Sequence, residues 1–377
     1  MSHTFIFSLG VVLISAFTAA RAVPADLSGF AETLRAELGV PALAVAATNS
    51  EGLTAAGVAG VRAAGGDDPA RITDRWHLGS LTKSMTATVA ARLVERGTIR
   101  WDATIAELDP ELAASVPEAH RTVTLGQLLA HRAGLPDDRF SAPLQMKMWT
   151  LEGPPEDQRR VLVPLLFAQP GVTPADETMR YTNGGYMVAG WMLETVAGEA
   201  WESLIQRELF EPLGMDSAGF GPPGMDPGQG AQPLGHGRGP DGPVPVPAVL
   251  GADNPPPFGP AGRVHCSITD LAAYARLHLR GLRGEDTGYL PHEAFVRLHA
   301  DPEGDGYALG WGVVGEGDDR RSTHTGSNTR WLALILVWPA RDLAIVAATN
   351  AVPQDAAHAD VLARLIDAAT NTGDRAP

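Results

Sequence analysis

The sequence has 377 residues, of which 44% are hydrophobic and 19% charged, a composition typical of one large or two medium-sized globular domains. Its 44 acidic residues outnumber 29 basic ones, and the net charge of −15 disfavours phosphate backbones, so we expect no nucleic-acid binding. The single cysteine, Cys266, excludes an intrachain disulfide framework and a cysteine-based metal cluster.

The N-terminus carries the pattern of a secretory signal peptide. An apolar run at 5–17 is followed by small residues, and Ala20-Arg21-Ala22 resembles an A-x-A cleavage site. The alternative is a membrane anchor, but the run is shorter than the ~20 residues that a spanning helix needs. No cysteine lies near the cleavage site, so a lipoprotein anchor is excluded. We therefore predict a signal peptide at 1–22, cleavage after Ala22, and a mature monomer in the periplasm or outside the cell, with no stable membrane anchor.

Hydrophobic periodicity indicates the elements that follow. Residues 25–38 have helical spacing and stop at Gly39, whereas 41–47 and 53–61 are typical of two strands joined by a turn. From residue 80 to about 210 the pattern is mainly helical, beginning with apolar residues four apart from Leu81. Further helices are predicted at 125–131, 161–167, 185–196 and 201–210.

The segment 219–262 differs, because 24 of its 44 residues are Gly or Pro. It could be a disordered linker or an ordered surface excursion, and the apolar residues within it favour the second. After a helix at 268–279, strands are predicted at 307–314, 321–324, 330–338 and 343–349, and a closing helix at 355–369.

Strands at both ends of the chain with helices between them favour an α+β fold. We expect an antiparallel sheet flanked by terminal helices, built from 23–75 and 263–377. The mainly helical domain inserted between them would span 76–262, including the Gly/Pro-rich excursion.

The segment Ser80-Leu81-Thr82-Lys83 is the first candidate for chemistry. A lysine three residues after a serine lies one helical turn away, where it can take the proton that makes serine nucleophilic. Only Lys83 and Lys147 are lysines, against 27 arginines, and arginine cannot lose its proton. The alternative is a helix-capping serine with an exposed lysine.

Two further motifs follow in the chain. Tyr181-Thr182-Asn183 offers a hydroxyl for proton transfer and an amide for binding a carbonyl, although it could be an ordinary Asn-Gly turn. His324-Thr325-Gly326-Ser327 ends a predicted strand, where glycine permits close approach of a ligand. The alternative for this segment is a turn at the sheet edge.

In this order, the three motifs resemble the serine β-lactamase and penicillin-binding-protein superfamily, in its class C β-lactamase-related branch of esterases, D-aminopeptidases and D,D-carboxypeptidases. Other segments resemble the family as well, from about residue 25 to 350. They include the LLAHRAGLP segment at 128–136, the PLGM turn at 212–215, Pro260-Ala261-Gly262, Leu309-Gly310-Trp311 and Thr349-Asn350. We interpret His131, within the first of these, as structural.

The resemblance implies a mechanism with no metal or cofactor. Ser80 would form an acyl-enzyme, while Lys83 and Tyr181 would share the transfer of the serine proton. Which of the two is the main base stays open. Asn183 would bind the substrate carbonyl. The backbone N–H groups of Ser80 and Ser327 would hold the oxyanion. The substrate site would be lined by His324, Thr325 and Gly326.

Two departures from class C β-lactamases bear on the substrate. His324 stands where those enzymes have lysine, and Pro353 and Ala356 stand near their asparagine and arginine. A neutral imidazole can offer a carboxylate only a hydrogen bond; Arg330 could compensate, or could be a strand-end charge. We therefore expect a small-molecule ester, amide or D-amino-acid peptide as substrate. The alternatives are a true β-lactamase or D-Ala-D-Ala carboxypeptidase, and an inactive binder of peptidoglycan fragments.

Overall fold

The computed structural model describes residues 23–137, 140–175, 178–353, 361 and 363–365. The predicted signal peptide and most of the predicted closing helix lie outside these residues. Among the described helices, none is both long enough and apolar enough to cross a membrane.

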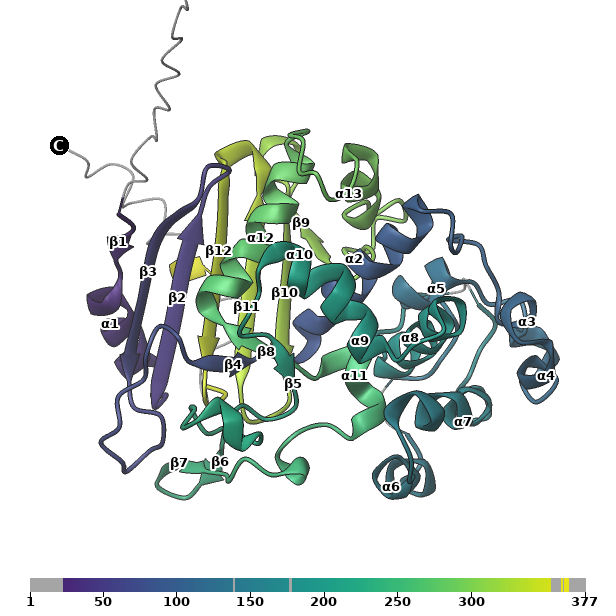
Figure 1. The fold of residues 1–377 in the computed structure, drawn as a ribbon, viewed down its shortest axis with the longest axis horizontal. Coiled ribbons are helices and arrows are strands. Elements are labelled where there is room, and N and C mark those ends of the chain that lie inside the picture. The colour runs from purple at the N-terminus through teal and green to yellow at the C-terminus, as the bar shows by residue number, and fades with distance from the viewer. Residues whose placement is uncertain (1–22, 138–139, 176–177, 354–360, 362, 366–377) are drawn as a thin grey trace, which may run out of the picture.

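A seven-stranded sheet is the main β structure, with strand order β1-β3-β2-β12-β11-β10-β9 (Figure 1). Neighbouring strands are antiparallel except for the parallel pair β1 and β3. Four strands come from the C-terminal part of the chain and three from the N-terminal part, so both ends build one sheet, as expected. The strands are β1 (Ala25–Asp26), β2 (Ala42–Thr48), β3 (Leu53–Gly60), β9 (Gly312–Val314), β10 (Arg321–Ser327), β11 (Leu332–Trp338) and β12 (Leu343–Thr349).

Each face of this sheet is covered by different elements. Helix α1 (Ser28–Leu38) packs on one face against Leu43 and Val45 of β2, and the buried Val361 and Leu365 join the same cluster. The alternate residues of β2 are alanines that belong to the core on the opposite face, where α12 (Ile268–Leu282) packs. These small side chains let the helix approach the sheet closely, and this larger core continues into the helical part of the molecule.

The helical part lies beside the sheet, with α2 (Thr82–Glu95) running through it (Figure 1). Eleven of the 14 residues of α2 are buried, so this helix is covered on nearly all sides and its first turn is fixed in place. The surrounding helices are α3 (Ile105–Leu108), α4 (Pro110–Ala113), α5 (Leu125–Leu129), α6 (Ala142–Thr150), α7 (Pro155–Phe167), α8 (Asn183–Ala197), α9 (Trp201–Ile205) with a π-helical continuation (Gln206–Phe210), α10 (Glu211–Leu213), α11 (Gly259–Gly262) and α13 (His292–Leu298).

The Gly/Pro-rich segment 219–262 is an ordered excursion. It supplies β5 (Gly219–Phe220) to a small sheet with β4 (Arg75–His77) and β8 (Val264–Ser267), and it forms the hairpin β6 (His236–Gly239) and β7 (Gly242–Pro245). Backbone hydrogen bonds join it to the large sheet's loops, including Leu234 N–H to Arg62 O at 2.9 Å. The segment is therefore part of the packed structure around the end of the sheet.

Several element boundaries differ from the sequence expectation; the helix predicted at 161–167, for instance, begins at Pro155. The helix predicted at 25–38 begins only at Ser28, because Ala25–Asp26 pairs with β3 as a strand. The strand predicted at 307–314 is wrong over its first half: only Gly312–Val314 is a strand. Gly306 and Gly310 have positive φ angles of 84° and 81°, which turn the preceding residues into a loop.

Candidate active site

Ser80 lies in a tight turn that leads into α2. The turn is a 3-10 segment, η1 (Gly79–Leu81), and α2 follows directly with Thr82. Gly79 has a φ of +52°, and a Cβ there would lie 2.4 Å from the backbone nitrogen of Ser327. A glycine is therefore required, and it lets the turn that holds Ser80 pack directly against the end of β10.

The amine of Lys83 is held by three oxygen atoms. Its Nζ lies 3.0 Å from Ser80 Oγ, 2.5 Å from Asn183 Oδ1 and 2.8 Å from the carbonyl oxygen of Ala261. The side chain is fully buried, and Nζ lies 4.9 Å from the ring centre of Tyr181. A neutral amine can donate its two N–H groups to Asn183 Oδ1 and Ala261 O and turn its lone pair towards the Ser80 hydroxyl, and it donates to all three oxygens once it has taken a proton.

The outer edge of β10 faces Ser80 where β9 stops. Strand β9 pairs only with Arg321 to Thr323, and the rest of that edge is covered by the turn η1. A Cβ on Gly326 would lie 2.0 Å from Leu78 O and 2.8 Å from Ser80 N. The absence of a side chain at Gly326 thus brings the backbone of the strand end next to the backbone N–H of Ser80, as a two-donor oxyanion site requires.

Tyr181 and Asn183 are placed by the start of α8. Thr182 is the N-cap of this helix, and its side chain accepts a hydrogen bond from Gly184 N–H. The backbone N–H of Thr182 in turn donates to Nδ1 of His131 at 3.2 Å, and the His131 ring lies 4.3 Å from that of Tyr181. Because Nδ1 accepts, Nε2 carries the hydrogen and donates to the Tyr307 hydroxyl at 3.2 Å. These contacts fit a structural role for His131.

His324 is a buried, neutral histidine in this site. Its Nδ1 lies 2.7 Å from the carbonyl oxygen of Gly310, so Nδ1 carries the hydrogen and donates it. Burial, with a smaller contribution from the nearby Lys83 charge, lowers the pKa of His324 to about 4, against the opposing effect of the Gly310 hydrogen bond. Nε2 therefore carries a lone pair at neutral pH, and it faces the Tyr181 hydroxyl at 3.5 Å.

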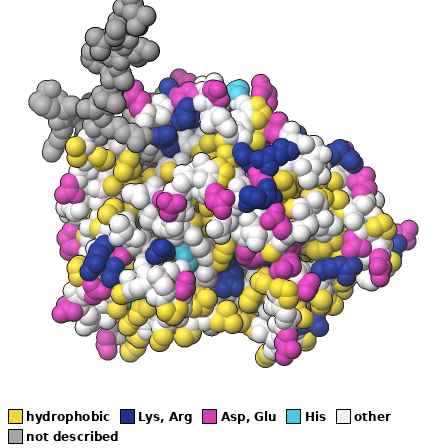
Figure 2. Space-filling view, in the orientation of Figure 1, with side chains coloured by type: hydrophobic (Ala, Val, Ile, Leu, Met, Phe, Trp, Pro, Cys, Tyr) yellow, Lys and Arg dark blue, Asp and Glu magenta, His cyan; other side chains and the backbone are white. Residues whose placement is uncertain are grey.

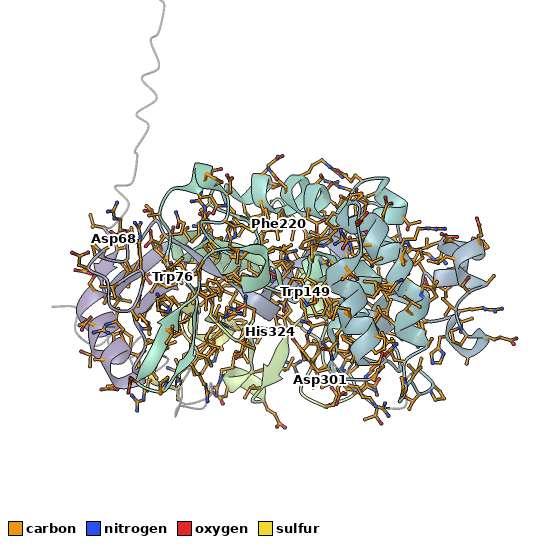
Figure 3. The ribbon with its side chains drawn as sticks, turned by 90° about the horizontal axis from the view of Figure 1, so that it is seen from below. Asp68, Trp76, Trp149, Phe220, Asp301 and His324 are labelled. Carbon is orange, nitrogen blue, oxygen red and sulfur yellow. The ribbon has the colours of Figure 1, made fainter. Side chains whose placement is uncertain are left out.

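The structure thus brings the three motifs together: Ser80 and Lys83 from the first, Tyr181 and Asn183 from the second, and His324, Gly326 and Ser327 from the third. Figure 3 shows His324 near the middle of the molecule, between the sheet and the helices. Thr325 alternates with His324 and Gly326, so its half-buried side chain points to the other side of the strand. Its part in substrate binding stays a prediction, as does that of Arg330, whose Nη2 lies 3.5 Å from Gly251 O.

Sequence reasoning missed contacts made by backbone carbonyls. Ala261 O binds Lys83 and Gly310 O fixes the tautomer of His324, but every residue type has a backbone carbonyl, so the sequence does not reveal these contacts. The one sequence feature that indicated a close backbone approach was the glycine at 310, where a Cβ would lie 2.7 Å from Ser84 Cα. That close approach is what places the loop against the first turn of α2.

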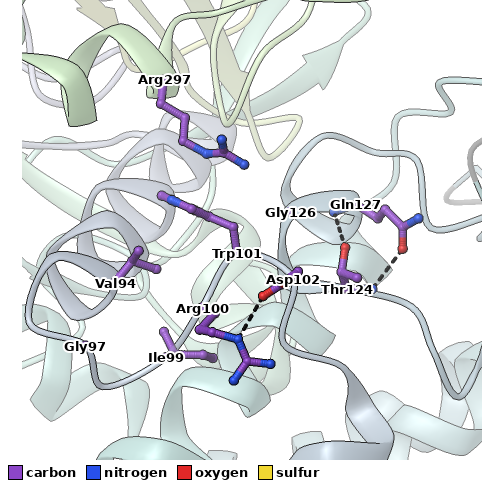
Figure 4. A pocket seen from close by; sticks show the side chains of 10 residues that line it. All are labelled: Val94, Gly97, Ile99, Arg100, Trp101, Asp102, Thr124, Gly126, Gln127 and Arg297. Atoms are coloured by element: carbon purple, nitrogen blue, oxygen red, sulfur yellow. Dashed lines mark hydrogen bonds and ion pairs between the residues drawn. The ribbon is translucent and has the colours of Figure 1, made fainter.

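A separate pocket lies at the other end of α2. It has a volume of about 610 Å³, and its lining includes Val94, Trp101 and Gln127, with Arg297 over the Trp101 ring at 5.2 Å (Figure 4). Val94 is 11 residues after Lys83, which corresponds to about 16 Å along a helix. This pocket shares no residue with the candidate site. On the face shown in Figure 2, acidic and basic side chains are interspersed and form no continuous basic surface.

Comparison with known proteins agrees with this arrangement. Penicillin-binding protein 4 of Amycolatopsis lactamdurans is 31% identical over 202 residues, 53% of this chain and 50% of the relative. The lovastatin esterase of Penicillium rubens is 29% identical over 172 residues, 42% of each chain. The chain thus spans about half the length, or less, of these curated relatives.

Among solved structures, the octameric penicillin-binding protein homologue from Pyrococcus abyssi superposes with a TM-score of 0.74 at 21% identity, covering 92% of this chain and 76% of that one. At that identity the likeness concerns the fold, which confirms the expected β-lactamase/transpeptidase-like architecture. The sequence model of the β-lactamase family matches residues 27–368. With its three motifs gathered around Ser80, the chain belongs to the β-lactamase family of serine hydrolases.

Proposed function

We propose that this protein is a secreted hydrolase that cleaves carboxylic esters or amides, D-amino-acid derivatives among them, through a covalent acyl-enzyme on Ser80. The observation that carries the proposal is the contact of 3.0 Å between Lys83 Nζ and Ser80 Oγ, with Nζ held by Asn183 and Ala261. A nucleophile within hydrogen-bonding distance of a proton acceptor, itself oriented by a third group, is the arrangement that nucleophilic catalysis needs.

Acylation begins with attack of Ser80 Oγ on the acyl carbon of the substrate. The serine proton passes to the Lys83–Tyr181 pair and from there to the departing alcohol or amine. The Tyr181 hydroxyl lies beside Nε2 of His324 at 3.5 Å, so this imidazole can accept a hydrogen bond from the phenol while the proton moves. Asn183, whose Oδ1 already holds Lys83, has an amide that can donate to a substrate carbonyl.

The developing oxyanion would be held by backbone N–H groups. Those of Ser80 and Ser327 are candidates because Gly79 and Gly326 bring the two backbone segments into direct contact. Removing one donor from such a site typically costs about 2.7–4 kcal/mol in the transition state. Water then attacks the acyl carbon with the same groups reversing their roles, and the acid is released.

His324 supports the preference for esters and amides over β-lactams. A β-lactam carries a carboxylate that a lysine could hold with its charge. Here the ring is neutral, and Nε2, which faces Tyr181, is an acceptor that would repel a carboxylate oxygen. The esterase among the relatives is consistent with this preference.

The test is labelling with a fluorophosphonate, followed by hydrolysis of a panel of p-nitrophenyl esters, nitrocefin and D-Ala-D-Ala peptides. We expect the wild type to gain one phosphonyl group and to hydrolyse at least one ester or peptide, and Ser80→Ala to do neither. Ser84→Ala is the matched control, since the Ser84 hydroxyl is buried on α2 and donates to Leu81 O at 2.7 Å. A wild type that neither labels nor hydrolyses would favour the inactive binder of peptidoglycan fragments, and Ser80→Ala that still labels would place the nucleophile elsewhere.

A further inference from the structure

A buried carboxylate outside the three motifs joins the two segments that form the candidate oxyanion site. Asp253 lies in the Gly/Pro-rich excursion, and its side chain has no exposed surface. Its Oδ1 lies 2.8 Å from His77 Nε2 and 2.9 Å from Asn328 Nδ2, and Oδ2 lies 3.3 Å from Arg263 Nε. The His77 N–H does not have the alignment of a full hydrogen bond to the carboxylate, so Asp253 holds the imidazole mainly through the attraction between its charge and the N–H dipole.

The first branch of this hydrogen-bond network, through His77, reaches the turn that holds Ser80. Nδ1 of His77 accepts a hydrogen bond from Gly79 N–H at 3.1 Å, and Gly79 directly precedes Ser80. A nitrogen that accepts carries no hydrogen, so a neutral His77 has its hydrogen on Nε2, towards Asp253. The carboxylate thus orients the imidazole that holds the peptide group next to Ser80.

The second branch of the network, through Asn328, reaches the end of β10. Asn328 directly follows Ser327, and its Nδ2 donates to Asp253 while its Oδ1 accepts from Arg330 N–H at 3.2 Å. The amide of Asn328 is therefore bonded at both ends, and it fixes the backbone just beyond the second candidate oxyanion donor.

A third contact links the same loop to Lys83. The backbone N–H of Asn254 donates to Asp253 Oδ1 at 2.7 Å, and its side-chain amide donates to Gly262 O at 2.9 Å. Gly262 follows Ala261, whose carbonyl binds Lys83. One buried carboxylate thus connects to the turn of Ser80, the strand end of Ser327 and the loop that holds the lysine.

We infer that Asp253 is a positioning residue that sets the separation of the two oxyanion donors, Ser80 N–H and Ser327 N–H, through His77 and Asn328. The inference rests on the proposed function, because this separation matters for chemistry only if Ser80 is the nucleophile. Burial tends to raise the pKa of Asp253, but His77 and Arg263 hold it below its ordinary value, so the group is a carboxylate at neutral pH. Donors must lie within about 2.7–3.1 Å of the oxyanion, and a misplacement of about 1 Å can cost on the order of 100-fold in rate.

The test is Asp253→Asn, which keeps the shape of the side chain and removes its charge. The probe is a fluorophosphonate: Ser80 Oγ bonds to phosphorus, fluoride leaves, the serine proton goes to the Lys83–Tyr181 pair, and the phosphonyl oxygen occupies the oxyanion site. We expect the labelling rate to fall by roughly 10- to 100-fold, kcat for the best substrate to fall by a similar factor, and KM to change by less than about threefold.

The matched control is Glu194→Gln, another buried carboxylate-to-amide change. Glu194 is bonded to Arg159 at the far end of α8 from Asn183, and its loss should lower the thermal midpoint without changing the labelling rate. If Asp253→Asn does not fold, Asn328→Ala tests the branch through Asn328 alone, and we expect its labelling rate to fall by about fivefold or more.

The outcomes separate this inference from the proposed function. A wild type that does not label would contradict the proposed function. A labelling wild type with equal labelling and kcat in Asp253→Asn, or in Asn328→Ala, would overturn the positioning role. An equal fall in Glu194→Gln would do the same, since it would attribute the loss to general destabilisation.

Discussion

The Tyr181 hydroxyl and Nε2 of His324 face each other at 3.5 Å, and Nε2 is the nitrogen with the lone pair because Nδ1 donates to Gly310 O at 2.7 Å. The imidazole at this position can therefore accept a hydrogen bond but cannot donate one towards the substrate. This sharpens the interpretation from sequence, in which a neutral histidine could still offer a hydrogen bond to a carboxylate. It also makes position 324 the natural place to test substrate preference.

His324→Lys should shift selectivity from esters towards β-lactams. The wild type should hydrolyse short-chain p-nitrophenyl esters far faster than nitrocefin, and the lysine variant should change that ratio by roughly tenfold, since charge-assisted hydrogen bonds are about twice as strong as neutral ones. The measurement is kcat/KM for both substrates in each variant. Because the two substrates are compared within one protein, a general loss of activity cancels.

Rapid nitrocefin hydrolysis by the wild type, at the rate of the best ester, would contradict this prediction. It would indicate that another cation holds the carboxylate. Arg330→Ala would then identify that cation, because Arg330 lies three residues beyond Ser327 at the same strand end.

Lys83→Arg should be nearly as damaging as Lys83→Ala. Arginine keeps the positive charge but cannot accept the serine proton, and its planar fork cannot make the three contacts that Nζ makes in this fully buried site. The measurement is kcat for the best ester. Lys147→Arg is the control, because Lys147, the other lysine of the chain, is exposed on α6 and should tolerate the change. Retention of most activity in Lys83→Arg would make the lysine's role electrostatic and leave Tyr181 as the base.

The fold could be predicted well from sequence because its signals are local. The apolar run at 41–47 and the i, i+4 spacing after Leu81 reflect burial in the core, and both elements occur as expected. The first half of the segment 307–314 could not be predicted, since its apolar residues pack as a loop whose direction depends on the positive φ of Gly310. Burial of apolar residues in a loop gives the same pattern as burial in a strand.

The candidate site was predictable where helix geometry or glycine dictates the contact. Ser80 and Lys83 are three residues apart at a helix start, so their proximity follows from the sequence. The network around Asp253 was not predictable, because His77, Asp253 and Asn328 are separated by 176 and 75 residues and meet only through the folding of the 219–262 excursion. The tautomer of His324 likewise depends on a carbonyl 14 residues away.

Export should remove the first 22 residues. The apolar run at 5–17 and the small residues before Val23 predict cleavage after Ala22, so N-terminal sequencing of the exported protein should begin at Val23. Ala22→Arg should block processing, because the cleavage site requires a small residue at that position. Recovery of unprocessed protein that begins at Met1 in the cytoplasm would contradict the prediction.

Acidification should destabilise the fold between pH 6.5 and 4, before most carboxylates are protonated. Burial lowers the pKa of His265 and of His324 to about 4, and that of His278 to about 3. Burial also lowers the pKa of three further histidines: His131, His236 and His299. Below pH 6.5 the unfolded chain binds protons at these positions and the folded protein does not, so the free energy of unfolding falls as the pH falls. A single group shifted from 6.5 to about 4 accounts for about 3 kcal/mol by pH 4.

Urea denaturation at pH 7.5, 6.5, 5.5, 4.5 and 3.5 measures this effect. The midpoint should be nearly constant down to about pH 6.5 and then fall progressively. His324→Gln should reduce the slope, because it removes one of the buried groups that titrate in this window while keeping a polar side chain. A constant midpoint down to pH 4.5 would mean that these histidines become protonated without unfolding, and that their burial imposes no such cost. A loss that begins only below pH 4 would instead assign acid sensitivity to paired carboxylates such as Asp253, whose pKa lies below its ordinary value.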